Sequence, residues 1–529
     1  VGADGFYNGQ NSQGRAFVYH GSAAGLPAAA NWTADGNQGL ANFGFSVATA
    51  GDVNGDGYSD LIVGAPAYEA FGFIEGRAYV YQGGPSGLAH VSGWTAESNA
   101  ISSGYGFSVA NAGDVNGDGY GDVVVGAHQY DDGQSNGGAA FVYHGSSSGP
   151  SLVADSILES NLVGAGFGWS VATAGDVNGD GFSDVVVGAW LLSNDQIREG
   201  GAFLYDGSPS GLSLAPSWSA EGNQADSRFG AAVGSAGDVN GDGYSDVIVG
   251  AYSYSNGQTN EGAAFVYHGP ATGLKSNHDW IGDGHQGGRV YGAAVGSAGD
   301  VNGDGFSDVI VGAFEFTNGQ SAEGRAFAYH GSATGLSTSP NWTAEADQFL
   351  AFYGISVATA GDVNGDGYSD VIVGSQLYDN GQNDEGRAFV YHGSAVGLSF
   401  TANWTAESNQ ASSYFGSAVA GAGDVNGDGY SDVIVGVSQY SNGQANEGRS
   451  FAYLGSASGL GLSADWSAES NQAGANYGVS VSTAGDVNGD GYSDVIVGAH
   501  FYDNGQSNEG SALIYYGNGG AGMSLRPQQ

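Results

Sequence analysis

The chain has 529 residues, a formal net charge of −44 and no cysteine, so nucleic acid is an unfavourable partner and disulfides do not stabilise the fold. Hydrophobic residues make up 41% of the sequence, which is enough for a packed core and excludes a disordered acidic chain. No apolar run approaches the about 20 residues of a membrane-spanning helix, so we expect no membrane insertion.

One nine-residue acidic segment recurs eight times at a constant spacing of 62 residues. Each copy reads Asp-Val-Asn-Gly-Asp-Gly, then Tyr or Phe, then Ser or Gly, then Asp. A strict period over most of a chain predicts an array of equivalent structural units and not several unrelated domains. We therefore assign residues 1–518 to one repeat domain and residues 519–529 to a linker-like C-terminal tail.

Four short strands are predicted in each 62-residue repeat. In the repeat that spans residues 43–104, side chains alternate over residues 45–50, and the acidic loop follows at 52–60. A β-branched run at 61–65 predicts a buried second strand, and residues 76–81 and 94–97 predict the third and fourth strands. Four short strands joined by turns, without a helical period, are typical of one blade of an all-β propeller. The sequence thus predicts eight blades, with the acidic loop between the first and second strand of each.

The order of these motifs resembles the FG-GAP repeat of integrin α-subunit propellers and of related bacterial integrin-like surface proteins. Phe-Gly, the acidic loop, Val-Gly-Ala and Gly-x-Ala-x-Val-Tyr follow one another as in that repeat, and the resemblance covers residues 1 to about 518. The aromatic residue before glycine recurs at Phe43, Tyr105, Phe167, Phe229, Tyr291, Tyr353, Phe415 and Tyr477. The resemblance implies an extracellular or cell-surface protein, although integrin propellers have seven blades and load metal in only some of them.

The two ends of the chain together supply one third-strand segment too many for eight blades. Residues 1–3 align with residues 63–65, so the first repeat begins at the end of a second strand, and the last repeat has no fourth strand. We expect the fourth-strand segment at residues 31–35 to complete the last blade. The surplus third strand is then residues 14–20 or residues 510–516. It either packs outside its twin or replaces it, or it pairs with a neighbouring molecule and links propellers into a polymer.

The acidic loops have the composition of calcium sites. Side chains at positions 1, 3 and 5, the carbonyl at position 7 and the carboxylate at position 9 form an oxygen donor set without His or Cys, which favours Ca²⁺ over zinc or copper. Asn-Gly and Asp-Gly also make good hairpin turns, but a turn does not need three carboxylates that repel one another. We predict about eight Ca²⁺, one per repeat, with a structural role. The predicted ligands are Asp52, Asn54, Asp56, Tyr58, Asp60, Asp114, Asn116, Asp118, Tyr120, Asp122, Asp176, Asn178, Asp180, Phe182, Asp184, Asp238, Asn240, Asp242, Tyr244, Asp246, Asp300, Asn302, Asp304, Phe306, Asp308, Asp362, Asn364, Asp366, Tyr368, Asp370, Asp424, Asn426, Asp428, Tyr430, Asp432, Asp486, Asn488, Asp490, Tyr492 and Asp494.

Two further residue types recur once per repeat. Tryptophan in the fourth strand either packs between blades or stacks sugars in a multivalent lectin; it stands at Trp32, Trp94, Trp218, Trp280, Trp342, Trp404 and Trp466. Arginine opens the third strand in five repeats, where ion pairing within or between blades is expected; it stands at Arg15, Arg77, Arg325, Arg387 and Arg449. The repeat is most irregular at residues 69–74, 190–198 and 275–289, where a unique binding site is best sought.

The sequence favours a binding scaffold over an enzyme. It contains no His-Glu-x-x-His motif, and the Gly-x-Ser-x-Gly match at 145–149 is a serine-rich turn without the helix of a nucleophile elbow. We predict a secreted or cell-surface scaffold for adhesion or matrix assembly, which binds other proteins or matrix components and for which self-association into fibres stays open. A carbohydrate-binding propeller is the alternative, and an enzyme is a distant third.

Overall fold

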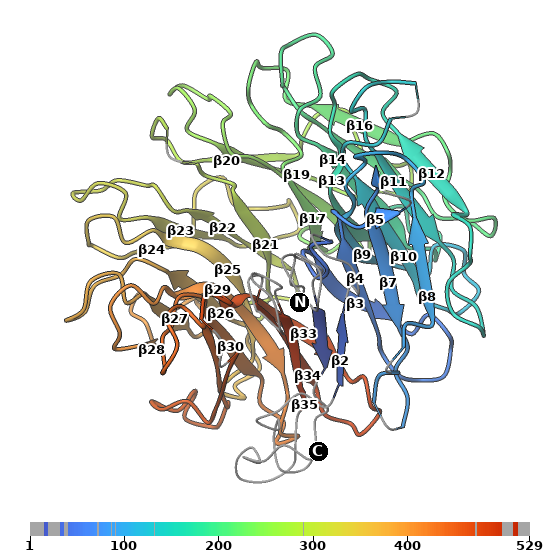
Figure 1. Ribbon diagram of the computed structural model, residues 1–529. Helices are drawn as coiled ribbons and strands as arrows, with labels where there is room; N and C mark the ends of the chain where they lie inside the picture. The colour runs from blue at the N-terminus through green and yellow to red at the C-terminus, as the bar shows by residue number, and fades with distance from the viewer. Residues whose placement is uncertain are drawn as a thin grey trace.

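The computed structural model describes residues 15–18, 32–35, 41–70, 73–85, 87–89, 91–131, 133–288, 290–470, 473–499 and 511–516. These residues form β-strands and no helix. Seven four-stranded antiparallel sheets and one three-stranded sheet follow one another in chain order. Figure 1 shows them fanned around a common centre, from the blue sheet that contains β3 to the red sheet that contains β33.

The strands recur in the same four positions of each sheet. The first strands are β3 (Val47–Gly51), β9 (Tyr105–Gly113), β13 (Phe167–Gly175), β17 (Ala232–Gly237), β21 (Ala294–Gly299), β25 (Tyr353–Gly361), β29 (Phe415–Gly423) and β33 (Tyr477–Gly485). The second strands are β4 (Asp60–Ala65), β10 (Asp122–Ala127), β14 (Asp184–Ala189), β18 (Asp246–Ala251), β22 (Asp308–Ala313), β26 (Asp370–Ser375), β30 (Asp432–Val437) and β34 (Asp494–Ala499). The third strands are β7 (Arg77–Tyr81), β11 (Ala139–Tyr143), β15 (Gly201–Tyr205), β19 (Ala263–Tyr267), β23 (Arg325–Tyr329), β27 (Arg387–Tyr391), β31 (Arg449–Tyr453) and β35 (Ser511–Tyr516). The fourth strands are β8 (Trp94–Glu97), β12 (Ser156–Glu159), β16 (Trp218–Glu221), β20 (Trp280–Asp283), β24 (Trp342–Glu345), β28 (Trp404–Glu407) and β32 (Trp466–Glu469).

The sheets form a closed ring of eight blades. Each first strand contacts the first strand of the next sheet, and β33 of the last sheet contacts β3 of the first. The second strands are buried along their whole length in the sheets where burial is described, as their β-branched sequence predicts. The predicted eight-bladed propeller with four strand positions per blade is therefore confirmed.

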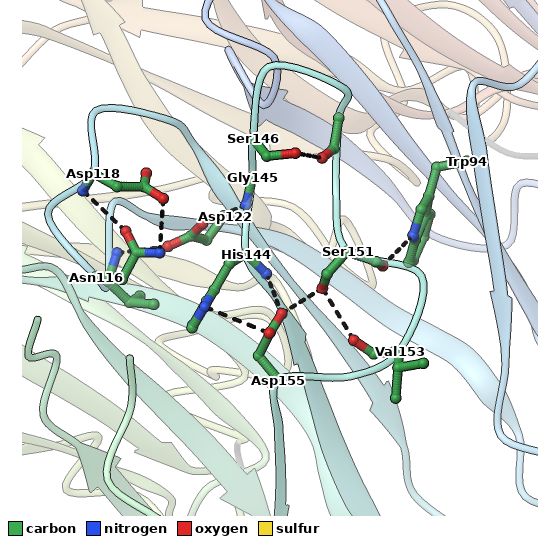
Figure 2. A network of polar contacts seen from close by, with 12 residues as sticks. Trp94, Asn116, Asp118, Asp122, His144, Gly145, Ser146, Ser151, Val153 and Asp155 are labelled. Carbon is green, nitrogen blue, oxygen red and sulfur yellow. Dashed lines mark hydrogen bonds and ion pairs between the residues drawn. The ribbon is translucent and has the colours of Figure 1, made fainter. Parts of the chain in front are cut away.

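The hydrophobic core lies between neighbouring blades. Trp94 of β8 packs edge-on against Tyr143 of the next sheet at a centroid distance of 4.7 Å, and its Nε1 donates to the Ser151 carbonyl at 2.6 Å (Figure 2). The seven fourth-strand tryptophans are all at most 5% exposed. The interpretation of these residues as core is confirmed, and they present no ring surface to a sugar.

The motif glycines mark the closest approach between blades. Gly106, which follows Tyr105, has a φ of 84°, and its carbonyl accepts a hydrogen bond from Ser46 of the preceding blade at 2.8 Å. A Cβ atom at Gly106 would lie 2.6 Å from the Arg77 carbonyl oxygen and 3.1 Å from Gly64 Cα. A side chain at this position would therefore separate the two blades.

Both ends of the chain contribute to the last blade. β1 (Arg15–Val18) pairs with β2 (Trp32–Asp35), and β1 lies against β35. Trp32 packs on Tyr81 of the first blade at 4.3 Å, as Trp94 packs on Tyr143, so β2 takes the expected fourth-strand position. The two third-strand copies thus lie side by side in this chain. Residues 1–14, 19–20, 510 and the tail at 519–529 are outside the described residues.

One element was not predicted from the sequence. The segment between β4 and β7 contains a short hairpin of β5 (Glu69–Ala70) and β6 (Phe73–Ile74), in one of the irregular stretches of the repeat.

Candidate metal centres

Each acidic loop folds around its first aspartate. In the loop at 114–122, Asp114 Oδ1 accepts hydrogen bonds from the amides of Gly117 at 2.6 Å and Asp118 at 3.1 Å, and Asp114 Oδ2 accepts one from Gly119 at 2.9 Å. Gly117 and Gly119 have φ values of 71° and 90°, which only glycine adopts readily. The glycines therefore let three amides point at one carboxylate.

The side chains at positions 3 and 5 are linked to each other. Asn116 Oδ1 accepts from the Asp118 amide at 3.0 Å, and Asn116 Nδ2 donates to Asp118 Oδ2 at 3.0 Å (Figure 2). Asp118 Oδ1 also accepts from the Tyr120 amide at 3.1 Å. Three of the predicted ligand side chains thus lie together on the exposed side of the loop.

The position-9 aspartate lies behind them and is fully buried. Asp122 Oδ2 accepts from the Val115 amide at 2.8 Å, and Oδ1 accepts from the Gly145 amide at 2.7 Å (Figure 2). Burial raises the pKa of the Asp122 carboxyl to about 7, the two amides oppose this rise, and the carboxylates of Asp114 and Asp118 add to it. The pKa is raised in the same way, to about 7, at Asp60, Asp184, Asp246, Asp308 and Asp370.

The residues fit a hard cation, with one adjustment. All the available donor atoms are oxygens. The three carboxylates repel one another, and a bound divalent cation would reduce this repulsion. In none of the described loops does one oxygen of each carboxylate lie within 4.8 Å of the other two. A cation bound by positions 1, 5 and 9 together would therefore draw these side chains closer.

The eight loops are linked to one another around the ring. In every blade the amide at position 8 donates to the position-1 carbonyl of the preceding loop. The donor and acceptor pairs are Ser59 and Asp486, Gly121 and Asp52, Ser183 and Asp114, Ser245 and Asp176, Ser307 and Asp238, Ser369 and Asp300, Ser431 and Asp362, and Ser493 and Asp424, at 2.7–3.1 Å. The aromatic ring at position 7 also covers the position-4 glycine of the preceding loop, as Tyr120 covers Gly55. The loops are thus part of the blade interface.

A second feature, largely missed from the sequence, is an aromatic cluster at the opposite end of the first three blades. Phe45, Phe107 and Trp169 stand at one repeat position, with ring centroids 4.8 Å and 4.6 Å apart, and Trp190 lies 4.2 Å from Trp169. A pocket of about 290 Å³ is lined by Trp169, Trp190 and His128. Later repeats carry Ala231, Ala293, Ile355, Ser417 and Val479 at the same position. The irregular stretches at 69–74 and 190–198 were the sequence signals of this cluster, since Ile74 lines a pocket with Phe45 and Phe107, and Trp190 lines one with Trp169.

The recurrent arginines form ion pairs within their blades, as expected. Each of the four whose side chains are described pairs with the glutamate opposite it on the fourth strand. The pairs are Arg77 with Glu97, Arg325 with Glu345, Arg387 with Glu407, and Arg449 with Glu469.

Comparison with known proteins agrees with this architecture. The family model of the FG-GAP repeat matches residues 43–81, 105–143, 167–189, 229–267, 291–326, 353–391, 415–453 and 477–515. The chain is 38% identical to integrin alpha-PS2 of Drosophila melanogaster over 173 residues, which are 29% of this chain and 12% of that protein. It is 34% identical to integrin alpha-V of Gallus gallus over 219 residues, 40% of this chain and 20% of that protein.

A third relative, integrin alpha-5 of Xenopus laevis, is 30% identical over 249 residues, which are 44% of this chain and 22% of that protein. The matched part thus spans less than a quarter of the length of each of these three relatives. Within the described part of the chain, no helix has the length and apolar character required to cross a bilayer.

Proposed function

Because this chain belongs to the FG-GAP repeat family, we propose that it is a calcium-bound propeller that acts outside the cell as a scaffold for adhesion or matrix assembly. The observation that carries the proposal is the ring of eight acidic loops, which are part of every blade interface. In the loop at 114–122, the side chains of Asp114, Asn116 and Asp118, the Tyr120 carbonyl and the Asp122 carboxylate would hold the ion. The equivalent residues of the other loops would hold seven more.

Bound calcium would have a structural role in this scaffold. It would offset two of the three negative charges in each loop, and it would fix the position-7 residue whose ring covers the preceding loop. Extracellular calcium modules bind at about 10⁻⁴–10⁻³ M. Such sites fill at the calcium concentration outside cells and are largely empty inside them, which favours an extracellular location.

The aromatic cluster supports a ligand-binding role for the end of the propeller that is opposite the acidic loops. The cluster breaks the repeat symmetry, because this repeat position is aromatic only in the first three blades, at Phe45, Phe107 and Trp169. Phe45 is 44% exposed, and Trp169 and Trp190 are half-buried around their pocket. Partly exposed aromatic side chains are enriched at protein interfaces, so we assign the adhesion ligand to this cluster.

A glycan is the second candidate ligand, because flat indole rings beside a pocket also bind sugars. The test is a binding panel of extracellular matrix proteins and glycans against the immobilised chain, in calcium and in chelator. Trp169→Ala and Trp190→Ala should abolish binding of the true ligand, whereas Phe400→Ala, which truncates a 79% exposed ring in another blade, should not. Binding that is equal in all variants would place the ligand elsewhere, and no binding by any panel member would contradict the adhesion proposal.

As part of the same function, we propose that the propellers self-associate into fibres by sharing strands between molecules. β1 and β35 carry the same repeat position and lie against each other within this chain, so strand sharing would be an exchange in which β1 of a second molecule displaces the chain's own β1 beside β35. Light scattering of the full chain in calcium tests this idea. Particles whose mass increases with protein concentration, and decreases when residues 1–20 are deleted, would support strand sharing. A mass that stays at that of the monomer would contradict it.

A further inference from the structure

Four blades place an arginine opposite the fourth-strand carboxylate, whereas the blade of β17–β20, like those of β9–β12 and β13–β16, has a small residue there. In the blade of β21–β24, Arg325 lies opposite Glu345 in the strand register and forms an ion pair with it. In the blade of β17–β20, Ala263 stands at the arginine position and lies opposite Asp283. Asp283 is therefore an acidic side chain, 9% exposed, without an arginine partner.

A second carboxylate lies next to Asp283. Glu261 is fully buried, and its Oε1 accepts hydrogen bonds from the amides of Asn256 and Gln258. Its Oε2 is also buried and has no hydrogen-bond partner among the described residues, as is the case for the equivalent glutamates Glu199, Glu323, Glu385 and Glu447, so this oxygen is available for a ligand but does not by itself distinguish the blade. An unpaired buried carboxylate oxygen is costly unless a cation approaches it.

The third member of the group is a histidine where other repeats carry asparagine or aspartate. His285 Nδ1 lies 2.5 Å from Asp283 Oδ1, and its side chain is 88% exposed. The equivalent residues are Asn99, Asn161, Asn223, Asp347 and Asn409, and all of them, like His285, have positive φ values near 50°. Asparagine adopts this left-handed conformation readily. The histidine therefore supplies an imidazole that the turn itself does not require.

We propose that Glu261, Asp283 and His285 bind one first-row divalent transition-metal ion, for which Zn²⁺ is the probe. These three residues each place a possible ligand atom within 4.8 Å of the other two. Two carboxylate oxygens and an imidazole nitrogen suit zinc, and the nitrogen donor distinguishes this site from the all-oxygen acidic loops.

The metal ion replaces the arginine of other blades. It supplies the positive charge that Arg325 gives to Glu345, and it approaches the unpaired Oε2 of Glu261. Glu261 lies on the segment between β18 and β19, Asp283 ends β20 and His285 follows it, whereas the acidic loop precedes β18, so the two kinds of site are at opposite ends of the blade. The exposure of His285 leaves coordination positions open to water.

The test measures Zn²⁺ binding to the full, untagged chain in an excess of Ca²⁺ that saturates the acidic loops. Isothermal titration should show one Zn²⁺ per chain, and Co²⁺ should give a visible spectrum of a site with nitrogen and oxygen ligands. His285→Asn introduces the residue that other repeats use and keeps the backbone bond from position 285 to Asp283 Oδ1. It should weaken Zn²⁺ binding at least about 100-fold, since loss of even an outer-shell partner costs about 10–100-fold.

Two further variants separate this site from general acidity. Glu261→Gln should also lose the ion, and its circular dichroism in calcium should show that the propeller remains folded. Asp347→Asn removes an exposed carboxylate at the equivalent position of the next blade, so it should leave Zn²⁺ binding unchanged. Absence of Zn²⁺ binding in the native chain, or equal affinity in the native chain and His285→Asn, would overturn the proposal.

Discussion

The contact between successive acidic loops predicts very different costs for alanine at two glycines of one loop. Gly55 and Gly57 flank Asp56, and their φ values are 71° and 88°. Alanine in this left-handed region costs about 1–2 kcal/mol at either position. A Cβ at Gly55 would lie 2.5 Å from Cε1 of Tyr120, whereas a Cβ at Gly57 would meet nothing within 4 Å.

The overlap adds the cost of overpacking at Gly55 alone. That cost is about 1–3 kcal/mol, so Gly55→Ala should destabilise the propeller by about 2–5 kcal/mol and Gly57→Ala by about 1–2 kcal/mol. The assay is denaturant unfolding in saturating calcium, followed by circular dichroism. Unfolding midpoints are compared, since a large ring need not unfold in two states.

A double-mutant cycle with Tyr120→Ala assigns the excess cost to the loop contact. In that background, the cost of Gly55→Ala should fall to that of Gly57→Ala, because the ring that the new Cβ would meet is gone. Equal costs of the two alanines in the native background would refute the interlocking of the loops. An unchanged excess in the Tyr120→Ala background would show that the excess has another origin.

Three other changes test separate parts of the structure. Trp94→Phe removes the bond from Nε1 to the Ser151 carbonyl and should cost about 1 kcal/mol in urea unfolding, whereas Trp94→Ala should cost about 3–5 kcal/mol; equal costs would contradict the packing role of the ring. Arg325→Met keeps the aliphatic stem but removes the cation from Glu345, which retains its hydrogen bond from Asn318 Nδ2, so it should lower the free energy of unfolding by about 1–3 kcal/mol, and a neutral result would show that the ion pair adds no stability. Removal of calcium by a chelator should lower the free energy of unfolding by about 0.4–1.4 kcal/mol per loop, relative to the protein in millimolar calcium. A melting temperature that does not respond to chelator would exclude a stabilising ion.

The repeat made most of the fold predictable. Eight copies in register fix strand positions more firmly than propensity does, and the buried runs such as residues 61–65 became the second strands. The position-9 aspartate was predicted only as a ligand. Its additional role, as acceptor for the amides of Val115 and Gly145, depends on where the turn after the third strand lies, which the sequence does not show.

Contacts between repeats were harder to predict. Phe45, Phe107 and Trp169 are 62 residues apart in sequence and form a cluster only because successive blades place the same position side by side. The group of Glu261, Asp283 and His285 likewise draws on two segments, the loop before the third strand and the end of the fourth strand with the turn that follows it. Residues that differ from the repeat consensus indicate where such clusters can form. Which of these residues come into contact depends on the geometry of the ring of blades.

Counting the bound ions tests the central claim most directly. Native mass spectrometry of the full chain in volatile buffer with calcium should show eight Ca²⁺ per chain, and Asp118→Ala, which removes a position-5 side chain, should show seven. A folded chain that retains no calcium, or a variant that retains as many ions as the native protein, would contradict the assignment of one calcium ion to each blade.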